Sequence, residues 1–400
     1  MTWTAAHAEE HLLGLELFGM KFGLERMRRL LTALGSPQER FDAIHVVGTN
    51  GKSSTVRMTA ALLEAHDMRA GAFLSPHLTS FAERIRIADA DLEPAAFGAA
   101  VERAASAAAK VDRGLRDGER VTQFELITAA AFDALARGGV EVAVVEAGLG
   151  GRHDATGVLR APVVVLTNVG LEHTRWLGST IPDIAREKLA VVAPGATLVL
   201  GDAQPEVVAL AEATGARVVR PEPVASGLPG FQGDNFAAAC AAARARLGRL
   251  DPAIVADVAS WISVPGRMQV VGERPLTILD GAHNPSGIGA LAAALPERPF
   301  VGVVSILDDK DAAAMLRVLA PACERFVCTA APSPRALPPA TLASLAEQLG
   351  TPAEIVPAPR AALARARELA GPDGAVVVTG SIYLIADLVS EPGARRASAL

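Results

Sequence analysis

The chain has 400 residues, 50% of them hydrophobic, and a formal net charge of −6 from 38 Lys+Arg and 44 Asp+Glu. This length suits two domains better than one core, and the scattered basic residues exclude a nucleic-acid footprint. No apolar run approaches the ~20 residues of a membrane span. The N-terminal "MTWTAAHAEEHLLGLELFGM" lacks the basic leader and apolar core of a signal peptide. We therefore expect a cytoplasmic monomer with no membrane or nucleic-acid partner.

The cysteines favour the same compartment. Cys240, Cys323 and Cys328 are odd in number and lie in apolar surroundings. We interpret them as small buried hydrophobic residues in a reducing environment, and we expect no zinc site.

Short β-branched runs alternate with longer Ala-, Leu- and Arg-rich segments of helical spacing. This alternation is typical of parallel sheets covered by helices. A first set of strands is expected at 44–47, 70–74, 140–146, 163–167, 197–200 and 217–219. A second set is expected at 276–279, 300–305, 325–328, 354–356 and 375–379. The sequence therefore predicts an α/β fold with a separate sheet in each domain.

The Pro- and Gly-punctuated stretch "VPGRMQVVGERP", 264–275, separates the two sets of strands. Such a stretch predicts a domain boundary, which we place between an N-terminal domain at 1–268 and a smaller C-terminal domain at 269–400. "GLPGFQGDN" is expected to be a loop leading into a helix at 235–247. "APSPRALPPA" is expected to be a surface loop that opens another helix.

Ligands of open α/β sheets bind beyond the carboxyl ends of the strands. Polar segments that directly follow predicted strands are therefore the candidates for ligand binding. Five segments meet this condition: "GTNGKSS", "LSPHL", "VVEAGLGGRHD", "LTNVGLEHT" and "LDGAHNP".

The first of these segments has the features of a phosphate-binding loop. Gly48 and Gly51 allow amides to point at an anion, and the following helix offers its N-terminal dipole. Lys52 supplies a charge for the β and γ phosphates, and Ser53, Ser54 or Thr55 can place a hydroxyl on Mg²⁺. The alternative is an ordinary strand-to-helix turn with a solvated lysine.

Glu146 ends a fully apolar strand, where a carboxylate is costly unless it is paired or bound to a metal. We interpret it as a magnesium-positioning acid; the alternative is an ion pair with Arg152. His173 is an unusual magnesium ligand and by itself is more typical of a hydrogen-bonded loop residue. Lys188 lies on an expected helix, where a solvated lysine is the ordinary interpretation.

Asp280, His283 and Asn284 follow a strand of the second domain, and Pro285 suits the first turn of a helix. Arg267 lies on the expected linker, from which a guanidinium can reach a phosphate. The alternatives are capping residues and an exposed arginine.

Taken in order, these segments resemble the folylpolyglutamate synthase and dihydrofolate synthase family, the folate branch of the Mur-type ATP-dependent amide ligases. The resemblance covers nearly the whole chain. It is carried by "KFGLERMRRLL", "IHVVGTNGKSS", "LSPHLTSFAERIRI", "FELITAAAF", "VVEAGLGGRHDAT", "TNVGLEHTRWLGSTIPDIAREK", "PGRMQVV", "ILDGAHNPSG" and "VVTGSIYLIADL".

The resemblance implies an N-terminal P-loop-type ATP-binding domain with a parallel sheet, and a smaller C-terminal Rossmann-like α/β domain. It implies ATP and Mg²⁺ as cofactors, with a second Mg²⁺ an open alternative. The implied catalytic residues are Lys52, Lys188, Arg267 and His283, with Lys188 carbamylated. The implied nucleotide-binding residues are Gly48, Thr49, Asn50, Gly51, Lys52, Ser53, Ser54, Asn235, Arg267 and Asp280. The implied metal ligands are Ser54, Ser75, Glu146 and His173.

The implied reaction is ATP-dependent addition of L-glutamate to a reduced folate through an acyl phosphate, with dihydropteroate as a further acceptor. A Mur-type ligase acting on a cell-wall precursor is an alternative, and so is a P-loop regulator. Ser53 replaces the family's usual glycine, as in the Mur branch. Gly157 replaces the asparagine of Asp-Ala-Thr-Asn, and Phe231 with Gln232 replaces a frequent His-Gln pair. These departures bear on which folate is preferred.

Overall fold

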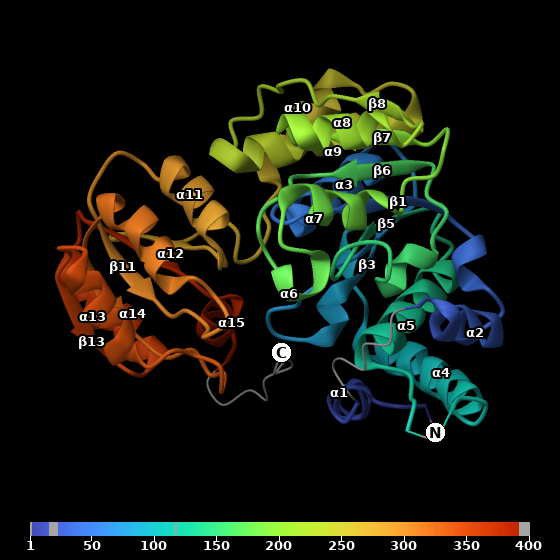
Figure 1. Ribbon diagram of the computed structural model, residues 1–400, viewed down its shortest axis with the longest axis horizontal. Coiled ribbons are helices and arrows are strands. Elements are labelled where there is room, and N and C mark those ends of the chain that lie inside the picture. Colours follow the sequence, from blue (N-terminus) through green and yellow to red (C-terminus); the bar gives the residue numbers. More distant parts are fainter. Residues whose placement is uncertain (1, 16–22, 117, 392–400) are drawn as a thin grey trace. The chain divides into compact units, whose positions relative to one another are not determined.

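The computed structural model describes residues 2–15, 23–116 and 118–391. The chain divides into two compact units (Figure 1), Met1–Leu228 with Gln232–Ile262, and Pro229–Phe231 with Ser263–Leu400. The change of unit after Ile262 falls just ahead of the Pro- and Gly-punctuated stretch 264–275. The start of the segment "KFGLERMRRLL" lies outside the described residues.

The described part of the first unit contains an eight-stranded sheet of order β4-β3-β2-β5-β1-β6-β7-β8. All its pairs are parallel except β2 with β3 and β3 with β4. The strands are β1 Asp42–Val47, β2 Ala70–Phe73, β3 Ile85–Ile87, β4 Ala90–Asp91, β5 Val142–Glu146, β6 Val163–Leu166, β7 Thr197–Leu200 and β8 Arg217–Val219.

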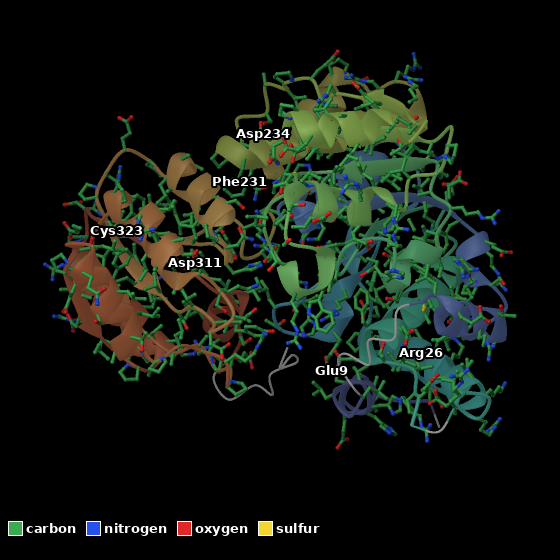
Figure 2. The ribbon with its side chains drawn as sticks, viewed as in Figure 1. Glu9, Arg26, Phe231, Asp234, Asp311 and Cys323 are labelled. Atoms are coloured by element: carbon green, nitrogen blue, oxygen red, sulfur yellow. The ribbon has the colours of Figure 1, made fainter. Side chains whose placement is uncertain are left out.

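The central strands read as unbroken apolar runs because helices cover the sheet. Every residue of β5 and β6 is buried, and α3 packs on β2 and β5. The helices here are α1 Ala5–Leu13, α2 Glu25–Ala33, α3 Lys52–Ala65, α4 Pro94–Asp112, α5 Gln123–Arg137, α6 Thr174–Leu177, α7 Ile181–Leu189, α8 Pro205–Glu212, α9 Gly230–Leu247 and α10 Pro252–Trp261. An ion pair of 2.7 Å joins Arg26 of α2, labelled in Figure 2, to Glu125 of α5.

The register of the sheet determines which strand ends lie next to one another at the site. In β1, Val46 lies opposite Glu146 of β5, and Val47 lies opposite Leu166 of β6. The loops after these parallel strands therefore emerge at one edge, which places Gly48, Glu146 and Thr167 in neighbouring positions.

The described part of the second unit contains a six-stranded sheet of order β13-β12-β11-β14-β10-β9, parallel except for β9 against β10. Its core includes Phe300, Phe326, Leu316 and Leu342. The strands are β9 Gln269–Glu273, β10 Leu276–Leu279, β11 Phe300–Val304, β12 Cys323–Cys328, β13 Ala353–Ile355 and β14 Ala375–Thr379. The helices are α11 Pro285–Ala294, α12 Ala312–Leu319, α13 Pro339–Gln348, α14 Pro359–Ala370 and α15 Ile382–Val389.

The two predicted α/β folds are confirmed, and every expected strand has its counterpart. The sequence missed β3 and β4, which are only three and two residues long. It also missed β9, whose Val270 and Val271 are exposed on an edge strand inside the expected linker. Short edge strands carry too few residues for a clear period-two pattern.

Helix α9 begins at Gly230, earlier than the predicted start at 235. Glycine disfavours helix by ~1 kcal/mol, which is why the segment predicted a loop. Burial of Gln232 and Asn235 and the hydrogen bond between their side chains, 3.2 Å, override this preference.

The three cysteines are free and buried, as predicted. Burial raises the pKa of the Cys323 thiol, labelled in Figure 2, to about 12 and that of Cys240 to about 11. Among the described residues, no helix combines the length and apolar character needed to cross a membrane.

Candidate active site

The loop from Gly48 to Gly51 takes a conformation that demands glycine at both ends. Gly48 has φ 153° and Gly51 has φ 81°, in the left-handed region. A Cβ at Gly48 would lie 1.8 Å from Thr167 Oγ1, and one at Gly51 would lie 2.3 Å from Asn235 Oδ1. Gly51 is followed directly by α3, so the loop leads into a helix N-terminus. The structure thus builds the predicted loop and places the predicted Asn235 against it.

The segment after β6 fixes the loop through backbone and side-chain hydrogen bonds. The Asn50 amide donates to Asn168 Oδ1 at 2.9 Å, and Asn168 Nδ2 donates to the Asn50 carbonyl at 3.1 Å. Thr167 Oγ1 donates to the same carbonyl at 2.7 Å. The Gly170 amide donates to Thr49 Oγ1 at 2.9 Å. Sequence reasoning missed Thr167 and Asn168, although both directly follow a strand in "LTNVGLEHT".

Two lysines converge on the carbonyls of the loop. Lys52 Nζ donates to the Thr49 carbonyl at 3.1 Å, and Lys188 Nζ donates to the Gly48 carbonyl at 2.7 Å. Only 4% of Lys188 is exposed, so the ordinary interpretation of a solvated helix lysine is wrong. Burial, assisted by the charge of Lys52, lowers the pKa of Lys188 to about 7. The amine therefore titrates near neutral pH.

Glu146 ends β5 with 1% exposure. Its carboxylate accepts hydrogen bonds from Ser53 Oγ at 3.0 Å and from the Ser75 amide at 3.1 Å. Arg152 does not pair with it and instead contacts Glu187 at 3.0 Å. The structure thus brings Glu146 together with Ser75, through its backbone amide, and with Ser53, which was predicted to bind the nucleotide.

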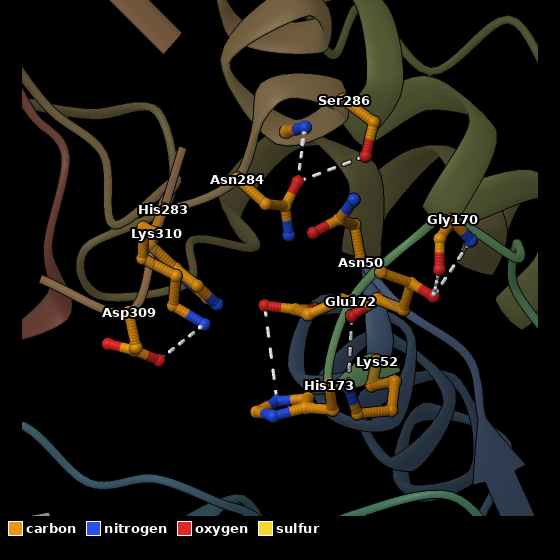
Figure 3. A network of polar contacts seen from close by, with 12 residues as sticks. Asn50, Lys52, Gly170, Glu172, His173, His283, Asn284, Ser286, Asp309 and Lys310 are labelled. Atoms are coloured by element: carbon orange, nitrogen blue, oxygen red, sulfur yellow. Dashed lines mark hydrogen bonds and ion pairs between the residues drawn. The ribbon is translucent and has the colours of Figure 1, made fainter. Parts of the chain in front are cut away.

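His173 lies in a left-handed conformation, φ 51°, at the start of α6. Its Nε2 is 4.0 Å from Glu172 Oε1, and 42% of the His173 side chain is exposed against 8% of Glu172. Figure 3 shows the Glu172 carboxylate directed at the His173 ring. Glu172 lies in the segment "LTNVGLEHT" but was not predicted as a site residue.

The oxygen donors of this region fit a magnesium ion that is completed by other ligands. The described residues contain no group of three or more His, Cys, Asp or Glu suited to a metal. Glu146 is instead accompanied by the Ser53 hydroxyl. Ser54 and Thr55, the next two residues of α3, are buried, and Thr55 Oγ1 has no hydrogen-bond partner. Mg²⁺ takes one or two carboxylates and fills its remaining positions with phosphate oxygens and water.

In the second unit, the loop after β10 gathers Arg267, Asp280 and His283. Asp280 is 2% exposed and accepts from the Met268 and Ala282 amides, each at 2.8 Å. Burial raises the pKa of Asp280, while Arg267 and His283 oppose that shift. A Cβ at Gly281 would lie 3.3 Å from an Arg267 nitrogen, so the guanidinium lies over this loop.

His283 Nδ1 lies 2.9 Å from the Gly281 carbonyl. A carbonyl only accepts, so Nδ1 carries the hydrogen in this contact. Asn284 caps α11 by accepting from the Gly287 amide at 2.7 Å and from Ser286 Oγ at 3.0 Å (Figure 3). The capping interpretation of Asn284 is therefore confirmed, and Pro285 lies in the first turn as predicted.

Comparison with known proteins matches residues 46–220 to the Mur ligase middle domain and residues 266–382 to the Mur ligase glutamate ligase domain. The Mycobacterium tuberculosis dihydrofolate synthase/folylpolyglutamate synthase is 35% identical over 78% of this chain and 75% of its own length. The folylpolyglutamate synthase of Lacticaseibacillus casei is 33% identical over 90% of this chain and 92% of its own. The chain belongs to the folylpolyglutamate synthase/dihydrofolate synthase family.

Solved structures support the same assignment. Mycobacterium tuberculosis folylpolyglutamate synthase complexed with ADP has a TM-score of 0.88 and 32% identity, covering 96% of this chain and 97% of that one. Escherichia coli FolC in complex with DHPP and ADP has a TM-score of 0.86 and 28% identity, covering 96% of both chains. A probable bifunctional folylpolyglutamate synthase/dihydropteroate synthase of Haloferax volcanii is 34% identical over 95% of this chain, which spans only 49% of that protein.

Asp154 lies in the loop that follows Glu146 and was not singled out from the sequence. It is buried and accepts from the Leu149 amide at 2.7 Å, the Thr156 amide at 3.0 Å and Thr156 Oγ1 at 2.5 Å. Burial raises its pKa. Asp154 therefore organises the glycine-rich loop that follows Glu146.

The departure at Gly157 has a steric basis in the same loop. A Cβ there would lie 2.6 Å from the Gly151 carbonyl oxygen. The asparagine usual in the folylpolyglutamate synthase family cannot enter this position unless the backbone of the loop moves.

Proposed function

We propose that the chain is an ATP-dependent ligase that forms an amide between L-glutamate and the carboxylate of a reduced folate, and that dihydropteroate is a second acceptor. The observation that carries the proposal is the glycine loop with Lys52, followed directly by Ser53, which bonds the buried Glu146 at the end of a parallel sheet. Family membership over nearly the whole chain supports it.

A carboxylate is a poor electrophile, so ATP supplies a leaving group. The substrate carboxylate oxygen attacks the γ phosphorus and ADP departs, giving an acyl phosphate. The glutamate amine then attacks the acyl carbon, the C–N bond forms, phosphate leaves and the amine loses a proton. Orientation and charge neutralisation supply most of the acceleration in such transfers.

We assign the binding of phosphate to the loop of Gly48, Thr49, Asn50 and Gly51 that leads into the N-terminus of α3, with Lys52 neutralising the transferred group. The Thr49 and Asn50 amides themselves donate to Asn168 and hold the loop in shape. Asn235 is assigned to the nucleotide beside Gly51. Ser53 is assigned to orienting Glu146 through its hydrogen bond. Ser54, Ser75, Glu146 and His173 would hold Mg²⁺, which neutralises phosphate charge when bound. In the second unit, Arg267, Asp280 and His283 are assigned to ATP.

We further propose that Lys188 is carbamylated. Its pKa of about 7 leaves a large neutral fraction at physiological pH. A neutral amine attacks CO₂, forming an N–C bond and releasing a proton, so the product is an oxygen-bearing anion in place of a cation. Such a group suits a site that holds metal and phosphate.

We also propose that residues 1–268 are the ATP-binding domain and residues 269–400 the glutamate-ligase domain. The two Mur ligase matches, at 46–220 and 266–382, support a division close to this boundary. The proposal includes a cytoplasmic monomer whose partners are small molecules. Sedimentation of the purified protein tests the oligomeric state.

The test is ADP release by purified protein with MgATP, L-glutamate, and either tetrahydrofolate or dihydropteroate. A ligase needs both co-substrates for turnover, whereas a P-loop regulator needs neither. Hydrolysis without a glutamylated product refutes the proposal. A cell-wall precursor as the only productive acceptor identifies the Mur-type alternative, for which Ser53 is the supporting feature.

We expect Lys52→Ala to abolish turnover, a loss of at least ~100-fold, because the charge facing the transferring phosphate is removed. Wild-type rates in that variant would refute the assignment of the loop. Circular dichroism of the variant checks that the loss is not unfolding.

A further inference from the structure

The turn after β7, residues 201–204, packs against the segment that fixes the phosphate loop. Asp202 is 5% exposed, and its Oδ2 accepts from the Val169 amide at 2.6 Å. Gln204 Nε2 donates to the Val169 carbonyl at 2.8 Å. The backbone N–H and the carbonyl of Val169 are therefore both hydrogen-bonded to side chains of the turn 201–204.

Gln204 does not use its side chain to cap the helix that it precedes. It occupies the N-cap of α8, where side chains usually accept from the helix amides, yet its side chain makes no capping hydrogen bond. Its Nε2 instead donates to the two carboxylate oxygens of Asp202, at 3.2 and 3.0 Å, and the backbone amide of Gln204 donates to Asp202 Oδ1 at 2.7 Å. Asp202 and Gln204 are thus bonded to each other as well as to Val169, and we call this pair the clamp.

The clamp lies one residue from the contacts that hold the loop. Val169 stands between Asn168, which exchanges hydrogen bonds with Asn50, and Gly170, which bonds Thr49. Gly201 also approaches closely, since a Cβ there would lie 2.5 Å from the Thr167 carbonyl oxygen. The turn 201–204 therefore contacts residues 167–170, and residues 167–170 in turn contact the phosphate loop.

We infer that Asp202 and Gln204 are positioning residues for the nucleotide, acting through Val169 and Asn168 on the backbone conformation of the phosphate loop. This inference rests on the proposed function, because it takes the loop to be the ATP site. Neither side chain forms a hydrogen bond with residues 48–51; the hydrogen bonds of both go to Val169 and within the turn. Their removal should therefore change nucleotide affinity without removing a phosphate ligand.

The test compares Gln204→Ala and Asp202→Asn with wild type and with His66→Ala. His66 makes comparable hydrogen bonds at the other end of α3, to Leu62 at 2.7 Å and to the Asp251 amide at 3.0 Å. MgADP affinity is measured by calorimetry, and KM for ATP, KM for glutamate, kcat and Tm are measured for each protein.

We expect Gln204→Ala to weaken MgADP binding and to raise KM for ATP by about fivefold, the factor typical of one lost hydrogen bond. KM for glutamate and kcat should stay within about twofold. Asp202→Asn places an amide where two amides donate and should weaken MgADP about tenfold or more. His66→Ala should lower Tm without changing MgADP affinity.

Unchanged MgADP affinity in Gln204→Ala overturns the inference, whatever happens to its Tm, and so does an equal loss in His66→Ala. Gln204 is only half-buried, so its variant keeps the test available if Asp202→Asn does not fold. MgADP binding is measured without acceptor or glutamate. Failure of wild-type ligation therefore refutes the proposed function and leaves the clamp's effect on nucleotide separately measurable.

Discussion

Burial of one amine has the clearest electrostatic consequence at the scale of single residues. Lys188 donates to the Gly48 carbonyl, and the charged groups that face it are Lys52, Glu172 and Asp154. Burial and Lys52 lower its pKa, while Glu172 and Asp154 act in the opposite direction. The desolvation effect is the largest, so the folded chain binds this proton far more weakly than the unfolded chain does.

This shift predicts that Lys188 makes stability rise with pH above neutrality. Below the folded pKa of about 7, both states hold the proton and the desolvation cost is fully present. Between pH 7 and roughly 10, the unfolded chain holds a proton that the folded chain has lost, so unfolding costs up to about 1.4 kcal/mol more per pH unit. We expect wild type to gain stability relative to Lys188→Met across this window.

Urea unfolding at pH 6.5, 7.5 and 8.5 in CO₂-free buffer measures this difference, since carbamylation cannot then intervene. A stability difference between the two proteins that is independent of pH would contradict the predicted shift.

The proposed carbamate gives a second prediction at this residue. Lys188→Ala should lose at least ~10-fold in kcat because it removes the group that carries the anion. Short carboxylic acids such as acetate should restore part of the rate, since a carboxylate can occupy the place of the carbamate. Steady-state ADP release with and without the acid measures the rescue, with Lys52→Ala as the variant that no acid should rescue. Absence of any rescue counts against the carbamate.

The start of α3 shows how one element depends on backbone conformation. Gly51 is its N-cap at φ 81°, and the space where a Cβ would lie is taken by Asn235 of α9. Phosphate binding at a helix N-terminus requires the backbone amides of the first helical turn to point toward the phosphate. The geometry of the first turn of α3 is therefore fixed jointly by a glycine torsion and by a side chain from a distant helix.

We expect Gly51→Ala to destabilise the chain by about 1–3 kcal/mol, because alanine is strained at this φ and its Cβ displaces Asn235. KM for ATP should rise at least ~10-fold. Thermal unfolding and steady-state kinetics measure the two effects. Gly195→Ala is the matched control, since Gly195 also has φ 80° but a Cβ there meets nothing within 4 Å. A KM for ATP in Gly51→Ala that is no higher than in Gly195→Ala would contradict the prediction.

The elements that the sequence missed share a physical cause. β3 and β4 are too short to show a period, and β9 is an exposed edge strand inside a Pro- and Gly-rich stretch. The start of α9 was misplaced because glycines lower local helix propensity, while the burial of Gln232 and Asn235 is a property of the folded chain. Long buried strands such as β5 were predicted because parallel sheets require unbroken apolar runs.

At the scale of the whole molecule, each unit has its own sheet, and the described phosphate loop lies in the first unit alone. We therefore expect two components in a calorimetric unfolding scan. MgADP at 100 times its Kd adds about 2.7 kcal/mol of stability. Because the phosphate loop and Lys52 lie in the first unit, the midpoint of that unit's component should rise by ~5 °C or more. A smaller rise is expected in the second component, which contains the Arg267, Asp280 and His283 assigned to ATP.

Lys52→Ala provides the control for this scan, since it should reduce the MgADP shift while leaving two components. A single component that moves as a whole with MgADP would contradict separate unfolding of the two units.

The sequence by itself determined the family, the two α/β folds and the loops that hold the candidate site, because apolar runs and glycine positions are local properties. It also led to Lys52, Glu146 and Lys188 through the motifs they occupy. Only the tertiary structure decided that Ser53 bonds Glu146, that Lys188 is buried beside Gly48, and that Asn168 fixes Asn50. These contacts join residues far apart in the chain. Their hydrogen bonds and desolvation depend on which strand ends become neighbours, a fact that sheet order sets and sequence spacing does not reveal.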